Sequence, residues 1–269
     1  MKIFITGSTG FIGQNLVQRY SDHEVFEFHR KLNLYESLRY FKPDLIINCA
    51  AEIYNRDEMV AVNVLLVKEC LDYVKEFPKT KMIQLGSSSE YGPVKRPSKE
   101  TDPIQALDMY SGTKGMATLL CQSYATTYNL DIVVVRPYSP YGPGERPHRL
   151  FPALWRSFKL DKPMDLVLGV HDFCYIDDFI DALDLIINSD QRTPGEIINV
   201  SSGVQTSNTD VLAVFKKVTG KDGLVNIKNT FTTPPVWAAD ISHVKLKYHW
   251  KPNHSLEQGI SKFLEKANY

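Results

Sequence analysis

The sequence lacks long apolar runs and an excess of charge of either sign. No apolar run approaches the ~18 residues that a membrane-spanning helix needs, and the start, MKIFITGSTG, lacks the apolar core and cleavage site of a secretory signal. Its 31 acidic residues balance 31 basic residues, so the positive surface that nucleic-acid binding normally needs is missing. We therefore expect a cytoplasmic protein that binds neither membranes nor nucleic acid.

Paired cysteines are also missing. Cys49, Cys70, Cys121 and Cys174 are widely separated, form no CxxC pair and have no cluster of histidines nearby. This spacing argues against a disulfide framework and against a zinc site. We expect four buried, reduced thiols and no bound metal.

Short β-rich apolar runs alternate with helical stretches through the first half of the chain. The runs read KIFIT, EVFEF, LIINCA, KMIQLGS and IVVVRPY, and helices are expected at about Ile12 to Tyr20, Glu58 to Phe77 and Met109 to Tyr128. Strands that are apolar throughout are typical of a sheet covered on both faces. The order therefore predicts an α/β fold with a Rossmann-type, doubly wound parallel sheet.

The composition of the sequence changes after Tyr138, where the segment SPYGPGERPHR is rich in proline and glycine. We expect residues 1–148 to form a dinucleotide-binding domain, and residues 149–170 and 201–269 to form a smaller substrate-binding region. Between them, DDFIDALDLIIN and EIINVSS predict a helix and a strand that return to the sheet. Residues 171–200 are therefore expected to rejoin the first domain, so that the two parts are interleaved.

A glycine-rich segment, GSTGFIG, follows the first expected strand directly. Gly7, Gly10 and Gly13 at this place permit a tight turn, let the backbone approach a pyrophosphate and let the next helix pack closely. The N-terminus of that helix supplies NH groups to the phosphates. A simple glycine turn is the alternative, but the position between a strand and a helix favours a dinucleotide site.

Tyr110 and Lys114 stand four residues apart in MYSGTKG, on one face of an expected helix. A tyrosine hydroxyl serves as acid or base in hydride transfer when its pKa of ~10 is lowered, and a nearby ammonium favours the phenolate. The same spacing recurs in YGPVK at 91–95, where glycine and proline disfavour a helix. The helical context selects Tyr110 as the candidate acid or base.

Three serines at 87–89 follow the expected strand KMIQL, at the carboxyl edge of the sheet where ligands bind. A hydroxyl there is able to hydrogen-bond a substrate carbonyl together with Tyr110. The alternative is a serine-rich loop whose hydroxyls bond the local backbone.

Further landmarks occur in one order along nearly the whole chain. They are GSTGFIG at 7–13, PDLIINCAA at 43–51, VNV at 62–64, GSSSEYG at 86–92, YSGTK at 110–114, RPYSPYGPGE at 136–145, HDFCYIDD at 171–178, INVSSG at 198–203 and ADIS at 239–242. With these landmarks the chain resembles the extended short-chain dehydrogenase/reductase family of nucleotide-sugar epimerases, dehydratases and reductases. The resemblance implies a nucleotide-sugar substrate and a homodimer in which two helices of each subunit form a four-helix bundle.

The resemblance also implies roles for single residues. Tyr110 is the proton donor or acceptor, Lys114 binds the nicotinamide ribose and tunes Tyr110, and one serine completes the triad. The family usually has one more residue in this loop, so that counting back from Glu90 gives Ser88, our preference, whereas counting from Tyr91 gives Ser87. The other cofactor contacts implied are Gly7, Gly10, Phe11, Ile12, Gly13, Ala50, Ala51, Asn63 and Tyr138. Candidate substrate contacts are Ser89 and Glu90 of the serine loop and Ser139, which stands where many relatives have an Asn that faces the sugar. Arg149 and His171 are the other available polar candidates.

Two features of the sequence narrow the choice among the reactions and cofactors of this family. Dehydratases of the family carry an Asp-Glu pair after the catalytic hydroxyl, and Ser89-Glu90 supplies only half of it, so dehydration is not expected. The stretch from His29 on, HRKLNLYESLRYF, resembles the GDP-fucose synthase and dTDP-4-dehydrorhamnose reductase branches. Arg30 there fits the 2'-phosphate of NADP, and a solvated basic turn is the alternative.

We therefore expect an NADPH-dependent reductase of an NDP-4-keto-6-deoxysugar, with NADP as cofactor. An NAD-dependent NDP-sugar epimerase with the same triad is the first alternative. A non-catalytic NADP-sensing protein on the same fold is the second.

Overall fold

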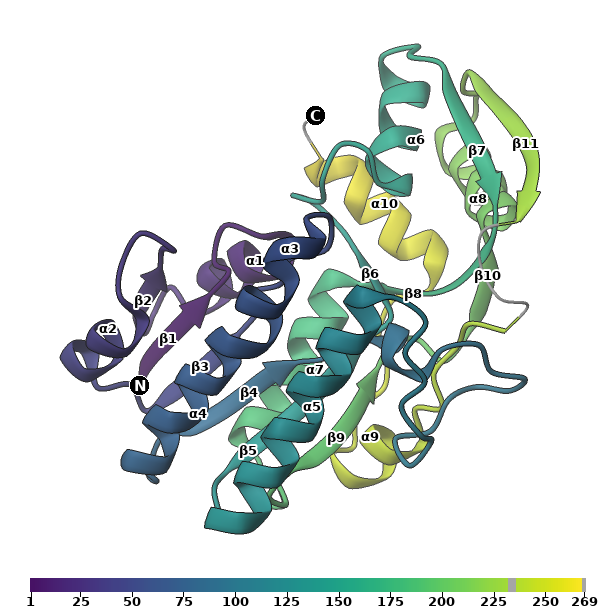
Figure 1. Cartoon of the computed structure of the whole chain (residues 1–269). Helices are drawn as coiled ribbons and strands as arrows, with labels where there is room; N and C mark the ends of the chain where they lie inside the picture. Colours follow the sequence, from purple (N-terminus) through teal and green to yellow (C-terminus); the bar gives the residue numbers. More distant parts are fainter. Residues whose placement is uncertain (232–235, 268–269) are drawn as a thin grey trace. The chain divides into compact units, whose positions relative to one another are not determined.

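The computed structural model describes residues 1–231 and 236–267, and it divides into two compact units (Figure 1). Unit 1 comprises Met1–Gly92, Glu100–Pro137 and Leu183–Asn199. Unit 2 comprises Pro93–Lys99, Tyr138–Ala182 and the described part of Val200–Tyr269. The change from unit 1 to unit 2 comes before the expected boundary at Arg149, because the strand that begins at Ser139 pairs within unit 2. The functions of the two regions stay predictions.

Unit 1 is built on one six-stranded sheet, in the order β2-β1-β3-β4-β5-β9. Its strands are β1 (Lys2–Thr6), β2 (Glu24–Phe28), β3 (Leu45–Asn48), β4 (Lys81–Leu85), β5 (Ile132–Pro137) and β9 (Glu196–Val200). Pairing from β2 to β5 is parallel, which confirms the Rossmann-type fold. The chain leaves β1 toward β2 and then returns to β3 on the other side of β1, so the carboxyl ends of β1 and β3 form a topological switch point, where ligands bind in such sheets.

Helices cover the sheet of unit 1. They are α1 (Phe11–Arg19), α2 (Leu34–Phe41), α3 (Arg56–Val60), the π-helix η1 (Ala61–Leu65), α4 (Leu66–Glu76), the 3-10 helix η2 (Ser88–Tyr91), α5 (Met109–Tyr128) and the second half of α7 (Ile176–Asn188). Helices α2, α4 and α5 pack side by side (Figure 1). Their buried apolar side chains form one core with Phe4, Ile46, Met82 and Val134 of the strands.

The helix expected at Glu58 to Phe77 is one unbroken helical stretch whose middle is the π-helix η1. The short helix α2 was not expected. Asn33 caps it by accepting a hydrogen bond of 2.9 Å from the backbone NH of Glu36, and the apolar side of α2 packs into the core through Leu34, Leu38 and Phe41. An Asn followed three residues later by Glu is a helix-start signal, so this element was predictable.

The described part of unit 2 has two small sheets and four helices that lie wholly within it. Its strands are β6 (Ser139–Tyr141), β7 (Met164–Leu168), β8 (Val170–Tyr175), β10 (Gln205–Ser207) and β11 (Val225–Phe231), ordered β10-β8-β6 and β11-β7. Its helices are α6 (Leu150–Lys159), α8 (Asn208–Thr219), α9 (Ser242–Lys247) and α10 (Leu256–Lys266). Aromatic rings fill the interior, with Tyr141 stacked on Phe151 at 3.9 Å between centroids.

A buried carboxylate joins three of the sequence landmarks within unit 2. Asp172 is fully buried and accepts hydrogen bonds from the hydroxyls of Ser201 and Ser202 and from the backbone NH groups of Gly203 and Ala239. The segments at 171–178, 198–203 and 239–242 therefore meet at one side chain, which explains their spacing as structural. No helix in the described part of the chain has the length and apolar character to cross a membrane.

Candidate active site

The glycine loop turns between β1 and α1 at the switch point of the sheet. Gly7 has φ +66°, a left-handed conformation that favours glycine, and a Cβ there would lie 2.7 Å from the backbone N of Ala50. A Cβ on Gly13 would lie 2.1 Å from the carbonyl O of Gly7. Gly10 is the N-cap of α1 and, having no side chain, leaves the first NH groups of this helix without a side-chain cap. The loop thus has the tight turn, the close helix packing and the open helix start that a pyrophosphate requires.

The segment after β3 forms the other side of the switch point and includes Ala50 and Ala51. Asn63, inside the π-helix η1, holds this segment: its Oδ1 accepts from the NH of Glu52 at 2.8 Å, and its Nδ2 donates to the Glu52 carbonyl at 2.9 Å and to Thr113 Oγ1 at 3.0 Å. π-Helical turns of this kind are frequent at functional sites. The Asn63 side chain is therefore committed to positioning the loop and α5, and we predict that it acts on the cofactor through them.

Arg30 lies in the turn after β2, and its side chain is 72% exposed. Its Nη1 is 3.4 Å from Oε2 of Glu58, the residue in α3 with which it forms an ion pair. Exposed ion pairs at this separation contribute little to stability and are screened by salt. The Arg30 guanidinium is thus held only loosely by its protein partner.

The three serines form a 3-10 turn at the carboxyl end of β4. Ser87 caps the turn: its Oγ accepts from the NH of Ser89 at 3.2 Å and lies 2.8 Å from Ser89 Oγ. Within the described residues, the Ser88 hydroxyl has no hydrogen bond to another protein group. Among the described residues, Ser87 and Ser89 thus bond each other and Ser88 bonds neither, and the assignment of Ser88 to the triad stays a prediction.

Replacing Ser88 with Ala is expected to lower kcat by about two orders of magnitude, the scale for loss of one hydrogen-bond donor to a reacting oxygen, without lowering Tm. Ser87→Ala is expected to lower the stability by about 1 kcal/mol, because it removes a cap. Ser89→Ala serves as the matched control. Steady-state kinetics and thermal unfolding of the three variants test this, and an activity loss that is larger in Ser87→Ala than in Ser88→Ala would contradict it.

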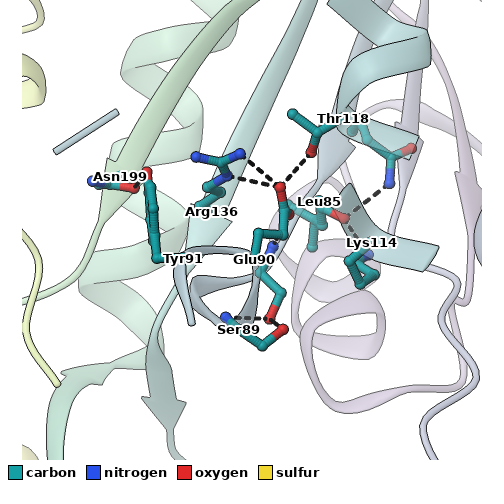
Figure 2. Close-up of polar contacts among 10 residues, drawn as sticks. Leu85, Ser89, Glu90, Tyr91, Lys114, Thr118, Arg136 and Asn199 are labelled. Atoms are coloured by element: carbon teal, nitrogen blue, oxygen red, sulfur yellow. Dashed lines mark hydrogen bonds and ion pairs between the residues drawn. The ribbon is translucent and has the colours of Figure 1, made fainter. Parts of the chain in front are cut away.

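Tyr110 and Lys114 lie one turn apart on α5, which packs against the serine turn. The Lys114 side chain is 2% exposed, and its Nζ donates to the carbonyl of Leu85, the last residue of β4 (Figure 2). Burial lowers the pKa of Lys114 below its ordinary value, and the charge of Glu90 opposes this shift. The structure therefore brings Lys114 to the strand end from which the serine turn starts.

Glu90 differs from its expected role as a substrate contact. Its side chain is 0% exposed, and both carboxylate oxygens accept hydrogen bonds from protein groups, among them Arg136 at 2.7 Å (Figure 2). The buried Glu90 carboxylate thus bonds the turn to its surroundings and is not exposed to a substrate. Ser89, the residue before it, is partly exposed. Arg136 was not singled out from the sequence, where nothing marks it as the partner of a residue 46 positions away.

A pocket of about 190 Å³ within unit 2 gathers three of the expected substrate residues: Ser139, Arg149 and His171. Aromatic rings form much of its wall. Glu145 and Asn208, which sequence reasoning missed, also line it, as does His148. In the described part of the chain, Glu145 Oε2 and Asn208 Oδ1 are buried without a hydrogen-bond partner, so the pocket offers two acceptors to a bound molecule.

Burial shifts the pKa values of two groups that line this pocket. Burial raises the pKa of Glu145 to about 7, against the opposing charge of Arg149, whose Nε lies 3.3 Å from Glu145 Oε1. Burial and the same arginine lower the pKa of His171 to about 4, so this imidazole is neutral at neutral pH. Perturbed groups gathered in a concave site are a mark of a functional pocket.

Residues 3–201 match the model of the NAD dependent epimerase/dehydratase family. The chain belongs to this family. It is an oxidoreductase-type enzyme of the NAD-dependent nucleotide-sugar epimerase/dehydratase family, as the family resemblance implied.

Among curated relatives, UDP-glucuronate 4-epimerase of Thermodesulfobacterium geofontis is 29% identical over 218 residues, 79% of this chain and 67% of the relative. Low-salt glycan biosynthesis protein Agl12 of Haloferax volcanii is 25% identical over 302 residues, 97% of this chain and 96% of the relative. Putative GDP-L-fucose synthase 2 of Arabidopsis thaliana is 25% identical over 300 residues, 98% of this chain and 90% of the relative. Epimerase and synthase names thus both occur among proteins similar to this one.

Solved structures give the same fold. UDP-glucuronic acid 4-epimerase from Bacillus cereus, in complex with UDP-glucuronic acid and NAD, has a TM-score of 0.88 and 24% identity, with 99% of this chain and 98% of that chain covered. dTDP-glucose 4,6-dehydratase from Bacillus anthracis, in complex with NAD, has a TM-score of 0.87 and 23% identity, with 98% and 96% covered. The identities are low, so these structures establish the fold of the chain.

Proposed function

We propose that the protein reduces the ketone of an NDP-4-keto-6-deoxysugar with NADPH. When bound, the nicotinamide would supply the hydride for the keto carbon. Tyr110 donates the proton to the oxygen, Lys114 favours this transfer electrostatically, and Ser88 hydrogen-bonds the same oxygen. The observation that carries the proposal is the free Ser88 hydroxyl at the strand end reached by Lys114. The pocket of unit 2, with Ser139, Arg149, His171 and the unexpected Glu145, is proposed to bind the nucleotide sugar.

Elimination of water is disfavoured by the state of Glu90. A dehydratase needs an acid and a base that reach the sugar, whereas this carboxylate is buried and fully bonded to Ser87, Thr118 and Arg136. The same loop has no aspartate before Glu90. Hydride transfer with a single proton donor is the chemistry that the remaining groups support.

Arg30 carries the choice of NADPH. A guanidinium presents a fork that matches phosphate oxygens, and Arg30 stands in the turn after the second strand, where the adenosine ribose of a dinucleotide lies in folds of this type. Its pair with Glu58 is exposed and long. A 2'-phosphate is therefore able to displace the Glu58 carboxylate from Arg30 at a small cost in free energy.

Wild-type protein is expected to bind NADPH roughly ten- to a hundredfold more tightly than NADH, the effect of one exposed hydrogen bond to a charged group. Arg30→Asp is expected to invert this preference, because it removes the partner of the phosphate, adds repulsion and offers a carboxylate to the ribose hydroxyls of NADH. Fluorescence titration of both cofactors against both proteins measures the four affinities. Added salt is expected to weaken the binding of NADPH more than that of NADH.

Glu58→Gln is the matched control for this experiment. It frees Arg30 from its carboxylate neighbour and is expected to strengthen the binding of NADPH while leaving that of NADH unchanged. Equal affinities of the wild-type protein for both cofactors, with no response to Arg30→Asp, would remove the support for NADPH.

An NAD-dependent NDP-sugar epimerase with the same triad is the second candidate. It is favoured by the curated 4-epimerase at 29% identity and by the NAD named in the solved relatives. An epimerase recycles one tightly held cofactor, whereas a reductase exchanges it in every turnover. Stoichiometric NAD released from the purified protein only by denaturation would therefore support the epimerase.

We also propose a homodimer formed through α5 and the helix that contains α3, η1 and α4. Both helices expose apolar side chains, namely Val60, Leu65, Met109, Met116, Leu119 and Tyr128. Exposed apolar surface on two neighbouring helices is typical of an interface. Light scattering is expected to give twice the mass of one chain at micromolar concentration, and the mass of a monomer would contradict the dimer.

A further inference from the structure

The carboxylate of Glu90 connects three elements beneath the serine turn. Oε1 accepts from the NH of Ser87 at 2.7 Å, and Oε2 accepts from Thr118 Oγ1 at 2.7 Å and from Nε and Nη2 of Arg136 at 2.9 and 2.7 Å (Figure 2). Ser87 belongs to the turn at η2, Thr118 to α5 and Arg136 to β5. One buried side chain thus fixes the position of the turn that carries Ser88.

The ion pair between Glu90 and Arg136 is itself buried, with side chains that are 0% and 1% exposed. The guanidinium also lies 4.4 Å from the centre of the Tyr91 ring, and the Tyr91 hydroxyl donates to Asn199 Oδ1 at 2.7 Å. Apolar residues of similar volume often stabilise a fold as well as a buried ion pair does. A role beyond stability is therefore the better reason for a charge at this place.

The position of Lys114 indicates a role for the Glu90 charge. Thr118, which donates to Glu90, lies one helical turn after Lys114 on α5. The ammonium bonds the Leu85 carbonyl, and among the described residues no carboxylate bonds it directly. Burial lowers the pKa of Lys114, and the charge of Glu90 is the largest of the effects that raise it.

The other titratable groups that act on Lys114 are two thiols, Cys49 after β3 and Cys121 on α5. Burial raises the pKa of Cys49 to about 12 and raises that of Cys121 as well. Both thiols are therefore neutral at physiological pH. Glu90 is the ionised group of opposite charge on which the ammonium depends, and the positive charge of Arg136 stands on the far side of that carboxylate (Figure 2).

We propose that Glu90 is a positioning residue: its charge holds Lys114 in the ammonium form, and its hydrogen bonds hold the turn at 87–91 against α5 and β5. The proposal rests on the roles proposed above for Tyr110 and Lys114. Glu90 does not touch the substrate in this scheme. It acts through the lysine that tunes Tyr110 and through the turn that presents Ser88.

The variant that tests it is the double substitution Glu90→Gln with Arg136→Met. Glu90→Gln alone would leave the Arg136 charge buried without its counter-ion, which is strongly destabilising, whereas the double variant removes both charges and keeps an acceptor for the NH of Ser87. The matched control is Asp131→Asn with Arg192→Met, which neutralises a second ion pair of unit 1, whose atoms lie 2.7 Å apart.

The first readout is the titration of the Lys114 ammonium in protein labelled with ¹⁵N-lysine, with the resonance assigned by its loss in Lys114→Met. A nearby opposite charge favours the charged form of a titrating group. The Lys114 midpoint is therefore expected to fall in the double variant and to stay in place in the control pair. The alkaline limb of the rate profile is expected to move to lower pH with it, so that the rate at a pH above both midpoints falls as well.

An unchanged Lys114 midpoint in the folded double variant would overturn the proposal, because Glu90 would then be structural only. A lowered midpoint with an unchanged rate would support the electrostatic role of Glu90 and contradict the role proposed for Lys114, so the two failures are distinct. Thr118→Val gives a second test that keeps both charges. Because Glu90 keeps its charge and only loses a donor, the Lys114 midpoint is not expected to fall in Thr118→Val, and a fall as large as that in the double variant would contradict the assignment of the effect to the charge of Glu90.

Discussion

Replacing Tyr110 with Phe is expected to lower turnover by about two to four orders of magnitude, the usual scale for loss of a positioned general acid. The hydroxyl is the only group removed, so the fold and the binding of cofactor are expected to be retained. Tyr110 lies one turn before Lys114, on the helix that packs against the serine turn. The measurement is the rate of NADPH oxidation with a 4-keto-6-deoxy nucleotide sugar, together with a cofactor titration of the same variant.

Tyr128→Phe is the matched control, because Tyr128 lies at the other end of the same helix, where its ring packs on that of Tyr124. It is expected to turn over like wild type. Near-normal turnover of Tyr110→Phe on the same substrate would contradict its assignment as the proton donor. The outcome separates chemistry from binding, since a loss confined to KM would also contradict it.

Most of the sheet of unit 1 was predictable because its strands other than the edge strand β2 are largely buried and therefore read as nearly continuous apolar runs. Helix α5 was predictable to the residue, and β9 and α7 were predicted by the run from 177 to 200. The π-helix η1 was not predictable: it coincides with the bonds of Asn63 to Glu52 and Thr113, which join residues far apart in sequence. No local pattern marks such a change of period.

The candidate site was predictable only where residues that lie close together in the structure are also close together in the sequence. The glycine loop and the Tyr110–Lys114 pair meet this condition. The pair of Glu90 and Arg136 does not, because parallel strands bring together residues far apart in sequence. Glu145 was hidden for a similar reason: its burial and its shifted pKa arise from the packing of the pocket in unit 2, and a glutamate in a segment rich in proline and glycine reads as exposed.

Gly13→Ala is expected to produce the largest loss of both stability and cofactor binding among single-methyl changes in the glycine loop. The new Cβ would lie 2.1 Å from the carbonyl O of Gly7 and 2.8 Å from Ser8 Cα. These are backbone atoms, so the contact is relieved only when α1 moves away from β1. Overpacking of this severity costs about 3 kcal/mol or more, and displacement of the helix start by about 1 Å is expected to lower activity roughly a hundredfold.

Gly112→Ala is the control that separates the position from the substitution. The same methyl group on Gly112 of α5 would meet only the side chain of Ala106, at 3.7 Å, an ordinary contact, and alanine favours a helix over glycine by up to about 1 kcal/mol. Chemical unfolding is therefore expected to show lower stability for Gly13→Ala and at least wild-type stability for Gly112→Ala, and cofactor titration is expected to show weaker binding only for Gly13→Ala. If Gly13→Ala unfolded and bound cofactor like wild type, α1 would have to pack less closely on Gly7 than the structure shows, and the glycine spacing would then be a simple turn without a role in binding the pyrophosphate.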